Sequence, residues 1–130
     1  MPRPYQAVVL AIVLAGCSGA KVYPDLSEKN LRVRTAAVGA KVAMGIHALD
    51  AQGNARYEGT VDLDQPVVEV GLPPGRATLL VFAFRSTGLF SPNTSIQKEV
   101  RLVPRAGRRY EARVSYRDAL YDVELAEIRQ

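Results

Sequence analysis

Three kinds of residue are scarce in this chain, and each scarcity narrows what the protein is. Its 130 residues hold one cysteine, Cys17, so no disulfide framework exists and packing must stabilise the fold. His47 is the single histidine, which leaves a zinc site short of ligands and a serine hydrolase triad short of its base. Tryptophan is absent, and six tyrosines and three phenylalanines supply the aromatic bulk. The composition predicts a protein that is not an enzyme and that holds no metal and no cofactor.

The N-terminal apolar run is short. Ala7–Leu14 falls well below the ~20 apolar residues that a membrane-spanning helix needs. Arg3 precedes the run, and the small residues Ala15 and Gly16 follow it, which is the layout of an export signal. We therefore predict a cleaved signal peptide over residues 1–16.

The end of this signal, Leu14-Ala15-Gly16-Cys17, resembles the lipobox of bacterial lipoprotein precursors. The resemblance implies that signal peptidase recognises Leu14, Ala15 and Gly16 and cleaves before Cys17, which carries diacylglycerol and a third acyl chain such as palmitate. Acyl chains anchor a protein because each buried CH₂ contributes ~0.8 kcal/mol. Ser18, where the enterobacterial sorting rule places aspartate for inner-membrane retention, favours the periplasmic side of the outer membrane. The rule varies among bacteria, so the inner membrane and the cell surface stay open as alternatives.

One folded domain is expected after the lipid. Ser18-Gly19-Ala20 is flexible and Pro24-Asp25 interrupts regular structure, so residues 17–29 are predicted to form a flexible tether. Residues 30–130 are long enough to bury a single hydrophobic core.

Alternation of apolar and polar residues predicts short strands throughout this domain. The patterns lie at 31–35, 41–50, 56–63, 66–70, 76–85, 96–103, 109–117 and 121–125. The turn at 50–54 predicts a hairpin of the second and third strands, in which Tyr57 shares a face with Gly59, Val61 and Leu63. Residues 104–108 are predicted to form a second hairpin turn.

Three segments carry more specific expectations. Residues 77–84 are apolar at both parities, which predicts either a central strand covered on both sides or a strand at the heart of a sandwich. A buried helix is the alternative, although Thr, Val and two Phe favour the strand. In 109–117 we expect Tyr110, Ala112, Val114 and Tyr116 to point inward. The last segment is predicted as a strand containing Tyr121, with a C-terminal helix as the alternative.

Seven or eight short strands without an amphipathic helix predict a single antiparallel β-sandwich of immunoglobulin or transthyretin type. The chain resembles small Gram-negative envelope lipoproteins that carry such a sandwich, through Leu14–Cys17, Val22-Tyr23-Pro24, Leu72–Gly75 and 106–110. The proline-glycine turn at 72–75 is also similar to PEGA-type and transthyretin-like surface domains. Many of these lipoproteins have no assigned function, so the resemblance implies a fold and a location in the cell envelope only.

Two groups of residues are candidate partner-binding surfaces. Leu89 and Phe90 lie in a polar loop, where they would either dock a partner or plug the end of the sandwich. The second group is basic and is expected on adjacent strands and their turn: Arg101, Arg105, Arg108, Arg109 and Arg113, with Arg117 beyond them. Asp62 and Asp64 are too few for a calcium site.

These observations predict a non-catalytic, membrane-anchored module that binds an envelope protein or peptidoglycan, and no nucleic acid. One alternative is an accessory lipoprotein of a secretion or envelope assembly, by analogy of layout with the transthyretin-like lipoprotein of type VI secretion machines. The other is a small-ligand binder or an enzyme whose site is not recognisable from the residues.

Overall fold

The computed structural model describes residues 25–87 and 95–128, and these residues form eight β-strands. None of the described residues belongs to a helix of the length and apolarity that crossing a membrane requires. The strands are β1 Leu31–Ala37, β2 Ala40–Leu49, β3 Ala55–Asp62, β4 Val67–Val70, β5 Thr78–Ser86, β6 Ser95–Leu102, β7 Arg109–Arg117 and β8 Leu120–Ile128.

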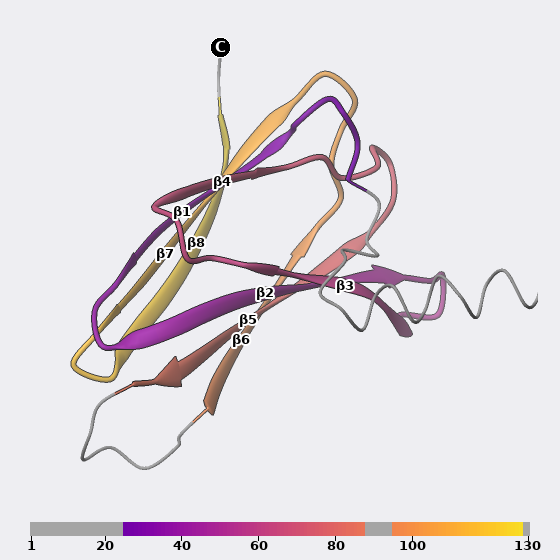
Figure 1. The fold of residues 1–130 in the computed structure, drawn as a ribbon. Coiled ribbons are helices and arrows are strands. Elements are labelled where there is room, and N and C mark those ends of the chain that lie inside the picture. The colour runs from indigo at the N-terminus through magenta and orange to yellow at the C-terminus, as the bar shows by residue number, and fades with distance from the viewer. Residues whose placement is uncertain (1–24, 88–94, 129–130) are drawn as a thin grey trace, which may run out of the picture.

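The strands build two four-stranded sheets that pack face to face, so the predicted β-sandwich is confirmed (Figure 1). Sheet A has the order β4-β1-β7-β8, and sheet B has the order β3-β2-β5-β6. All neighbouring strands are antiparallel except β1 and β7, which run parallel from Leu31 opposite Tyr110 to Ala37 opposite Tyr116. The sheets are therefore dominated by antiparallel pairing, with one parallel pair at the centre of sheet A.

The two ends of the sandwich are built from different connections. At the hairpin end, the β1–β2 turn and the β7–β8 turn lie side by side at the lower left of Figure 1, and the N–H of Val38 donates to the carbonyl of Tyr116 at 2.8 Å. The opposite end, called the strap end below, holds the residues before β1, the β4–β5 connection at 71–77 and the β6–β7 connection at 103–108.

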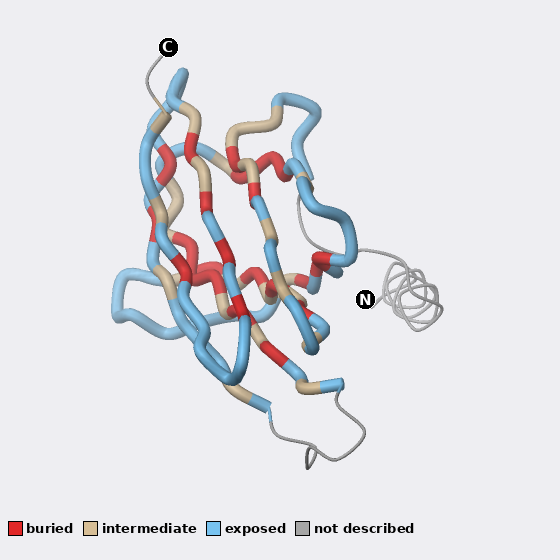
Figure 2. The backbone as a smooth tube through the Cα atoms, turned by 90° about the vertical axis from the view of Figure 1, so that its left-hand side faces the viewer, coloured by how far each residue is buried: buried red, intermediate tan, exposed pale blue. Residues whose placement is uncertain are grey.

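The core lies between the sheets and is filled by alternate residues of each strand, as the tube in Figure 2 shows. The inward-facing residues of β7 are those predicted, and all are buried: Tyr110, Ala112, Val114 and Tyr116. From β5, Leu80, Phe82 and Phe84 fill the centre with 0–1% exposure. Burying one side chain of this size contributes about 1.5–3 kcal/mol, so this layer is the main source of stability in a domain without disulfides.

A β-bulge separates the prediction from the structure in the β2–β3 hairpin. The register shifts between Ile46, which pairs with Gly59, and His47, which pairs with Tyr57. Gly59 and Val61 are buried as expected, whereas Tyr57 is 58% exposed. Because the bulge adds one residue to β3, it reverses the face on which every earlier residue of that strand lies. The prediction that Tyr57 shares a face with Gly59 and Val61 was therefore wrong.

The connection from β6 to β7 is not a hairpin turn, contrary to the prediction. β6 belongs to sheet B and β7 belongs to sheet A, so residues 103–108 cross from one sheet to the other at the strap end. The hydroxyl of Tyr110 accepts a hydrogen bond from the backbone N–H of Arg105 at 3.0 Å, which fixes the crossing to the first core residue of β7. Proline and glycine are typical both of hairpin turns and of connections that cross between sheets, so their presence at 104–108 does not distinguish the two.

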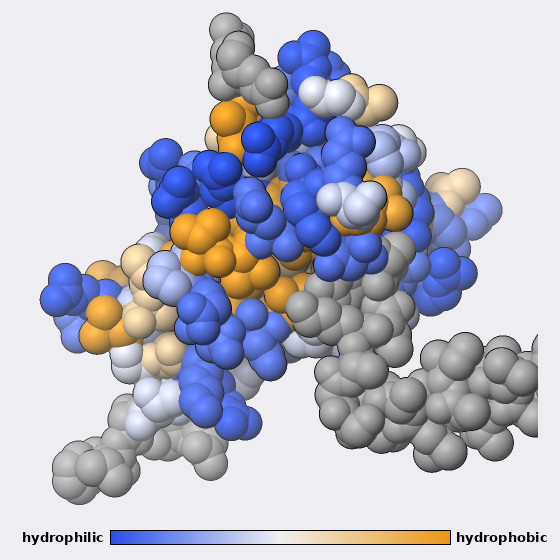
Figure 3. Space-filling view, turned by 45° about the horizontal axis from the view of Figure 1, so that its top comes forward, coloured by the Kyte–Doolittle hydropathy of each residue, from blue (hydrophilic) through white to orange (hydrophobic). Residues whose placement is uncertain are grey.

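Exposed hydrophobic side chains occur on several elements of the sandwich. Figure 3 shows hydrophobic residues gathered in the middle of one face with hydrophilic residues around them. Val38, Val67 and Leu120 are among the large hydrophobic residues that stay exposed, at 61%, 42% and 77%. Single exposed apolar residues are normal, so only a contiguous set of them carries information about function.

The last segment is a strand, and the helical alternative was wrong. β8 pairs with β7 without interruption from Leu120 opposite Arg117 to Ile128 opposite Arg109. The two strands are joined by Asp118 and Ala119, whose φ angles of 53° and 65° are both in the left-handed region. This is the geometry of a type I′ turn, in which glycine is the preferred second residue.

Ala119→Gly is therefore expected to stabilise the protein by about 0.5–1 kcal/mol. The left-handed conformation costs a non-glycine residue roughly 1–2 kcal/mol, and the greater freedom of glycine in the unfolded chain removes part of that gain. A urea titration followed by circular dichroism measures the change. Ala106→Gly is the matched control, because Ala106 is exposed in a turn without a positive φ, and there glycine should be slightly destabilising. Equal shifts for both variants would contradict the prediction.

Candidate functional site

Six of the predicted site residues lie outside the described part of the chain. They are Leu14, Ala15, Gly16 and Cys17 of the lipobox-like segment, and Leu89 and Phe90 of the loop between β5 and β6. The predicted roles of these residues remain predictions.

Residues 25–30, called the strap below, lie against the β4–β5 connection. The N–H of Leu26 donates to the carbonyl of Gly71 at 3.0 Å, and the N–H of Gly71 donates to Oδ1 of Asp25 at 2.9 Å. The side chain of Asn30 completes the contact, because its amide donates to the carbonyl of Leu72 and accepts from the N–H of Leu72, both at 2.8 Å. Residues expected within a flexible tether thus hold a defined position at the strap end.

Gly71 is the residue that allows the strap to lie so close. A Cβ at this position would overlap the backbone carbonyl of Leu26 and would lie 2.8 Å from the carbonyl oxygen of Glu28. Its backbone is not in the left-handed region, so the need for glycine comes from contact and not from conformation. The chain that leads back toward Cys17 is therefore fixed to the sandwich at Asp25.

The candidate arginines do not share one surface. Arg101 lies on β6 in sheet B, Arg105 and Arg108 lie in the crossing connection, and Arg109 and Arg113 lie on β7 in sheet A. The prediction that their strands are adjacent was wrong because β6 and β7 belong to different sheets. The structure brings together only subsets of the group, and Arg117 follows Arg113 along β7 toward the hairpin end.

On the outer face of sheet A, arginines alternate with glutamates and neutralise them. Glu111 accepts from Nε of Arg34 at 2.6 Å and from Nε of Arg113 at 3.2 Å. Arg34, with a smaller contribution from Arg113, holds the pKa of Glu111 below its ordinary value. Ion pairs this exposed contribute little to stability, so this face is a solvated charged surface and not a basic patch.

On the outer face of sheet B, the middle of the two central strands is uncharged. The residues concerned, called the β2–β5 stripe below, are Ala43, Gly45 and His47 on β2 and Leu79, Val81 and Ala83 on β5. The sequence carried a signal for this surface, because 77–84 is apolar at both parities. Among the described residues, however, no element covers the outer side of β5, and sequence reasoning did not select this face as a site.

His47 lies flat within this stripe. Its Nε2 is 3.4 Å from the place where a Cβ of Gly45 would lie, and its ring is 5.4 Å from the ring of Tyr57. The imidazole therefore fills the space that glycine leaves and smooths the face. Within the described residues, no group of three or more His, Cys, Asp and Glu side chains is arranged to hold a metal ion.

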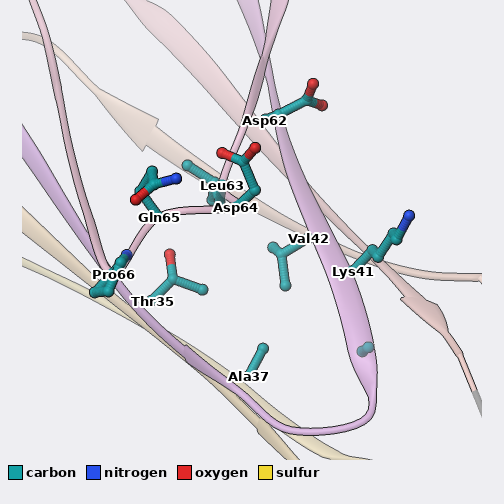
Figure 4. Close-up of a pocket in the computed structure, with 10 residues that line it drawn as sticks. Thr35, Ala37, Lys41, Val42, Asp62, Leu63, Asp64, Gln65 and Pro66 are labelled. Carbon is teal, nitrogen blue, oxygen red and sulfur yellow. The ribbon is translucent and has the colours of Figure 1, made fainter.

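A cleft of about 470 Å³ opens between the sheets near the hairpin end, under the connection from β3 to β4. Figure 4 shows that Ala37, Val42 and Thr35 point toward one another across it, whereas the carboxylates of Asp62 and Asp64 are directed away. The buried hydroxyl oxygen of Thr35 has no hydrogen-bond partner among the described residues. Polar and apolar residues both line the cleft, and its two carboxylates do not converge on a ligand position.

Comparisons with known proteins identify the fold. No family model matches the chain, and no curated protein matches it. Among solved structures, transthyretin from Sparus aurata matches with a TM-score of 0.55 and 13% identity, covering 77% of this chain and 98% of that chain. Sea bream transthyretin in complex with thyroxine matches with a TM-score of 0.53 and 15% identity, covering 75% and 94%. At these identities the likeness establishes a transthyretin-like β fold and nothing further.

Proposed function

We propose that this protein is a lipid-anchored, non-catalytic lipoprotein of the bacterial cell envelope whose sandwich binds an envelope protein or the cell wall. The observation that carries the proposal is Leu14-Ala15-Gly16-Cys17, which closes a short apolar segment and holds the one cysteine of the chain. A single cysteine in an exported protein would otherwise be a free reactive thiol, and acylation accounts for its presence.

The strap supports this proposal from the side of the folded domain. A lipid anchor positions a domain only if the tether ends at a fixed point on that domain. Here the tether that starts at Cys17 ends at Asp25, whose carboxylate accepts a hydrogen bond from the backbone N–H of Gly71. The chain between them spans at most ~3.6 Å per residue. The strap end would therefore stay near the bilayer, and the hairpin end would be presented to a partner.

The role of Cys17 is tested by metabolic labelling with palmitate. The wild-type chain is expected to take up label and to sediment with membranes, whereas Cys17→Ala should lose both properties completely, because without the thiol no lipid can be attached. Detection is by autoradiography of the purified chain and by immunoblotting of membrane fractions. A wild-type chain that reaches the envelope without label would overturn the proposal.

Ser18 provides the control. By the enterobacterial sorting rule, Ser18→Asp should keep the label and should move the protein from the outer to the inner membrane in an enterobacterial host. If Ser18→Asp is labelled but stays in the membrane where the wild type is found, the lipid on Cys17 is correctly assigned and the predicted location in the outer membrane is wrong.

A further inference from the structure

The two sheets present opposite kinds of outer surface. The central strands of sheet A carry arginine, glutamate and serine outward, as a solvated face requires. The central strands of sheet B carry the uncharged β2–β5 stripe at the equivalent positions. An antiparallel sheet that faced water on this side would show polar residues there, so the stripe indicates that another surface covers it.

The stripe is open in the described structure, although its members have only moderate exposure. Val81 and Ala83 are half-buried and Leu79 is 9% exposed. Such values belong to the middle of a flat sheet, where each side chain is flanked by neighbours on both adjacent strands. The covering by His47 over Gly45 adds to the flatness, and flat faces of this kind pack on a second sheet at about 10 Å.

We propose that a second copy of this chain docks on the outer face of sheet B, about a two-fold axis parallel to the strands. The register places three rows across the sheet: Tyr57-His47-Leu79-Arg101, Thr60-Gly45-Val81-Glu99 and Asp62-Ala43-Ala83-Gln97. This axis places each row opposite the same row of the other copy, with the strand order reversed. The β2–β5 stripes of the two copies therefore face each other, and β3 of one copy faces β6 of the other.

The rims of the face are complementary in this arrangement. Arg101, which has no ion pair among the described residues, faces the exposed ring of Tyr57 in a cation–π pair. Glu99 faces the hydroxyl of Thr60, and the amide of Gln97 faces the carboxylate of Asp62. The other possible in-plane axis, perpendicular to the strands, would set Glu99 against Glu99 and is therefore disfavoured.

The size of the face predicts a weak dimer. Four strands span roughly 19 Å and the three rows extend roughly 20 Å along them, which gives ~400 Å² for each copy and ~800 Å² in total. Stable interfaces bury about 1,200–2,000 Å², so this area lies below that range and corresponds to a weak, reversible, concentration-dependent dimer. Lys41 and Arg85 are register partners in the row that follows Ala43 and Ala83. The interface ends at this row, because these cations would face the same cations of the other copy.

The test measures the mass of the full chain, purified in a mild detergent, by light scattering across a wide range of micromolar concentrations. The wild type is expected to change from monomer to dimer. Val81→Lys should raise the dissociation constant about a hundredfold or more, because each copy would bury an unpaired ammonium group. Ser115→Lys is the matched control on the central strand β7 of sheet A, and it should dimerise as the wild type does.

A second pair of variants tests the axis without touching the stripe. Thr60→Glu should weaken the dimer because the new carboxylate faces Glu99 of the other copy, and adding Glu99→Lys should restore it. Within one copy the two positions lie three strand spacings apart, ~14 Å, so rescue reports contact between copies. Unfolding midpoints are recorded for all variants. A wild type that stays monomeric throughout, a dimer that survives Val81→Lys with the fold intact, or no rescue by the double change would overturn the proposal.

Discussion

Tyr110→Ala is expected to lower the free energy of unfolding by about 3–5 kcal/mol, which is the cost of truncating a buried aromatic side chain to alanine. Tyr110 is 6% exposed at the start of β7, where it packs between the two sheets. Its hydroxyl accepts the N–H of Arg105, so truncation also leaves a backbone donor in the crossing connection without its partner. Equilibrium unfolding in urea measures the loss.

Two further variants divide this effect into its parts. Tyr110→Phe keeps the ring and removes the acceptor, so it should cost about 1–2 kcal/mol. Arg113→Ala, on the opposite face of the same strand, should be nearly silent because the residue is exposed and its pair with Glu111 is solvated. A loss for Arg113→Ala as large as that for Tyr110→Ala would mean that the faces of β7 are inverted.

Gly71→Ala is expected to destabilise the domain by about 2–4 kcal/mol. The added methyl group would occupy the space of the Leu26 carbonyl, so the strap must leave its place. That movement breaks the hydrogen bonds of Gly71 with Leu26 and Asp25, each worth about 1 kcal/mol net, and exposes buried Leu72 to water. The expected result is a lower unfolding midpoint, together with faster amide exchange at Leu26.

A shortened chain separates this mechanism from a general defect at Gly71. In a chain that begins at Lys29, Leu26 and the carbonyl of Glu28 are absent, so Gly71→Ala should cost only a few tenths of a kcal/mol. Gly75→Ala is a useful comparison, because Gly75 has φ 80° and open space around it, and its cost should be the same in both chains. If Gly71→Ala is as costly in the short chain as in the full one, the strap is not the cause.

Local patterns were sufficient to predict the strands and most of their inward faces. Alternation in 109–117 identified Tyr110 and Tyr116 as core residues because a strand on one side of a sandwich has a strict period of two. The same logic failed at Tyr57, since a bulge is a relation between two strands and leaves no mark in the alternation of one.

Relations between distant segments could not be read from the sequence. The arginines were predicted on adjacent strands because β6 and β7 follow one another in the sequence, but the chain changes sheet between these two strands. The strap depends on contacts with Gly71 and Leu72 that lie far along the chain, and its own composition resembles that of a linker. The β5 half of the β2–β5 stripe was visible as the doubly apolar run 77–84, but only the strand order shows that no described element covers its outer side.

The parallel pairing of β1 with β7 has a consequence for the order in which the domain is made. Sheet B can assemble from two hairpins of consecutive strands, β2 with β3 and β5 with β6. β1 is synthesised before all of them, yet it sits between β4 and β7 and its partner residues run from Tyr110 to Tyr116. One edge of β1 can pair with β4 once residues 67–70 are made, but its other edge needs β7, and closing so long a loop slows folding. Sheet A therefore stays incomplete until β7 has left the ribosome.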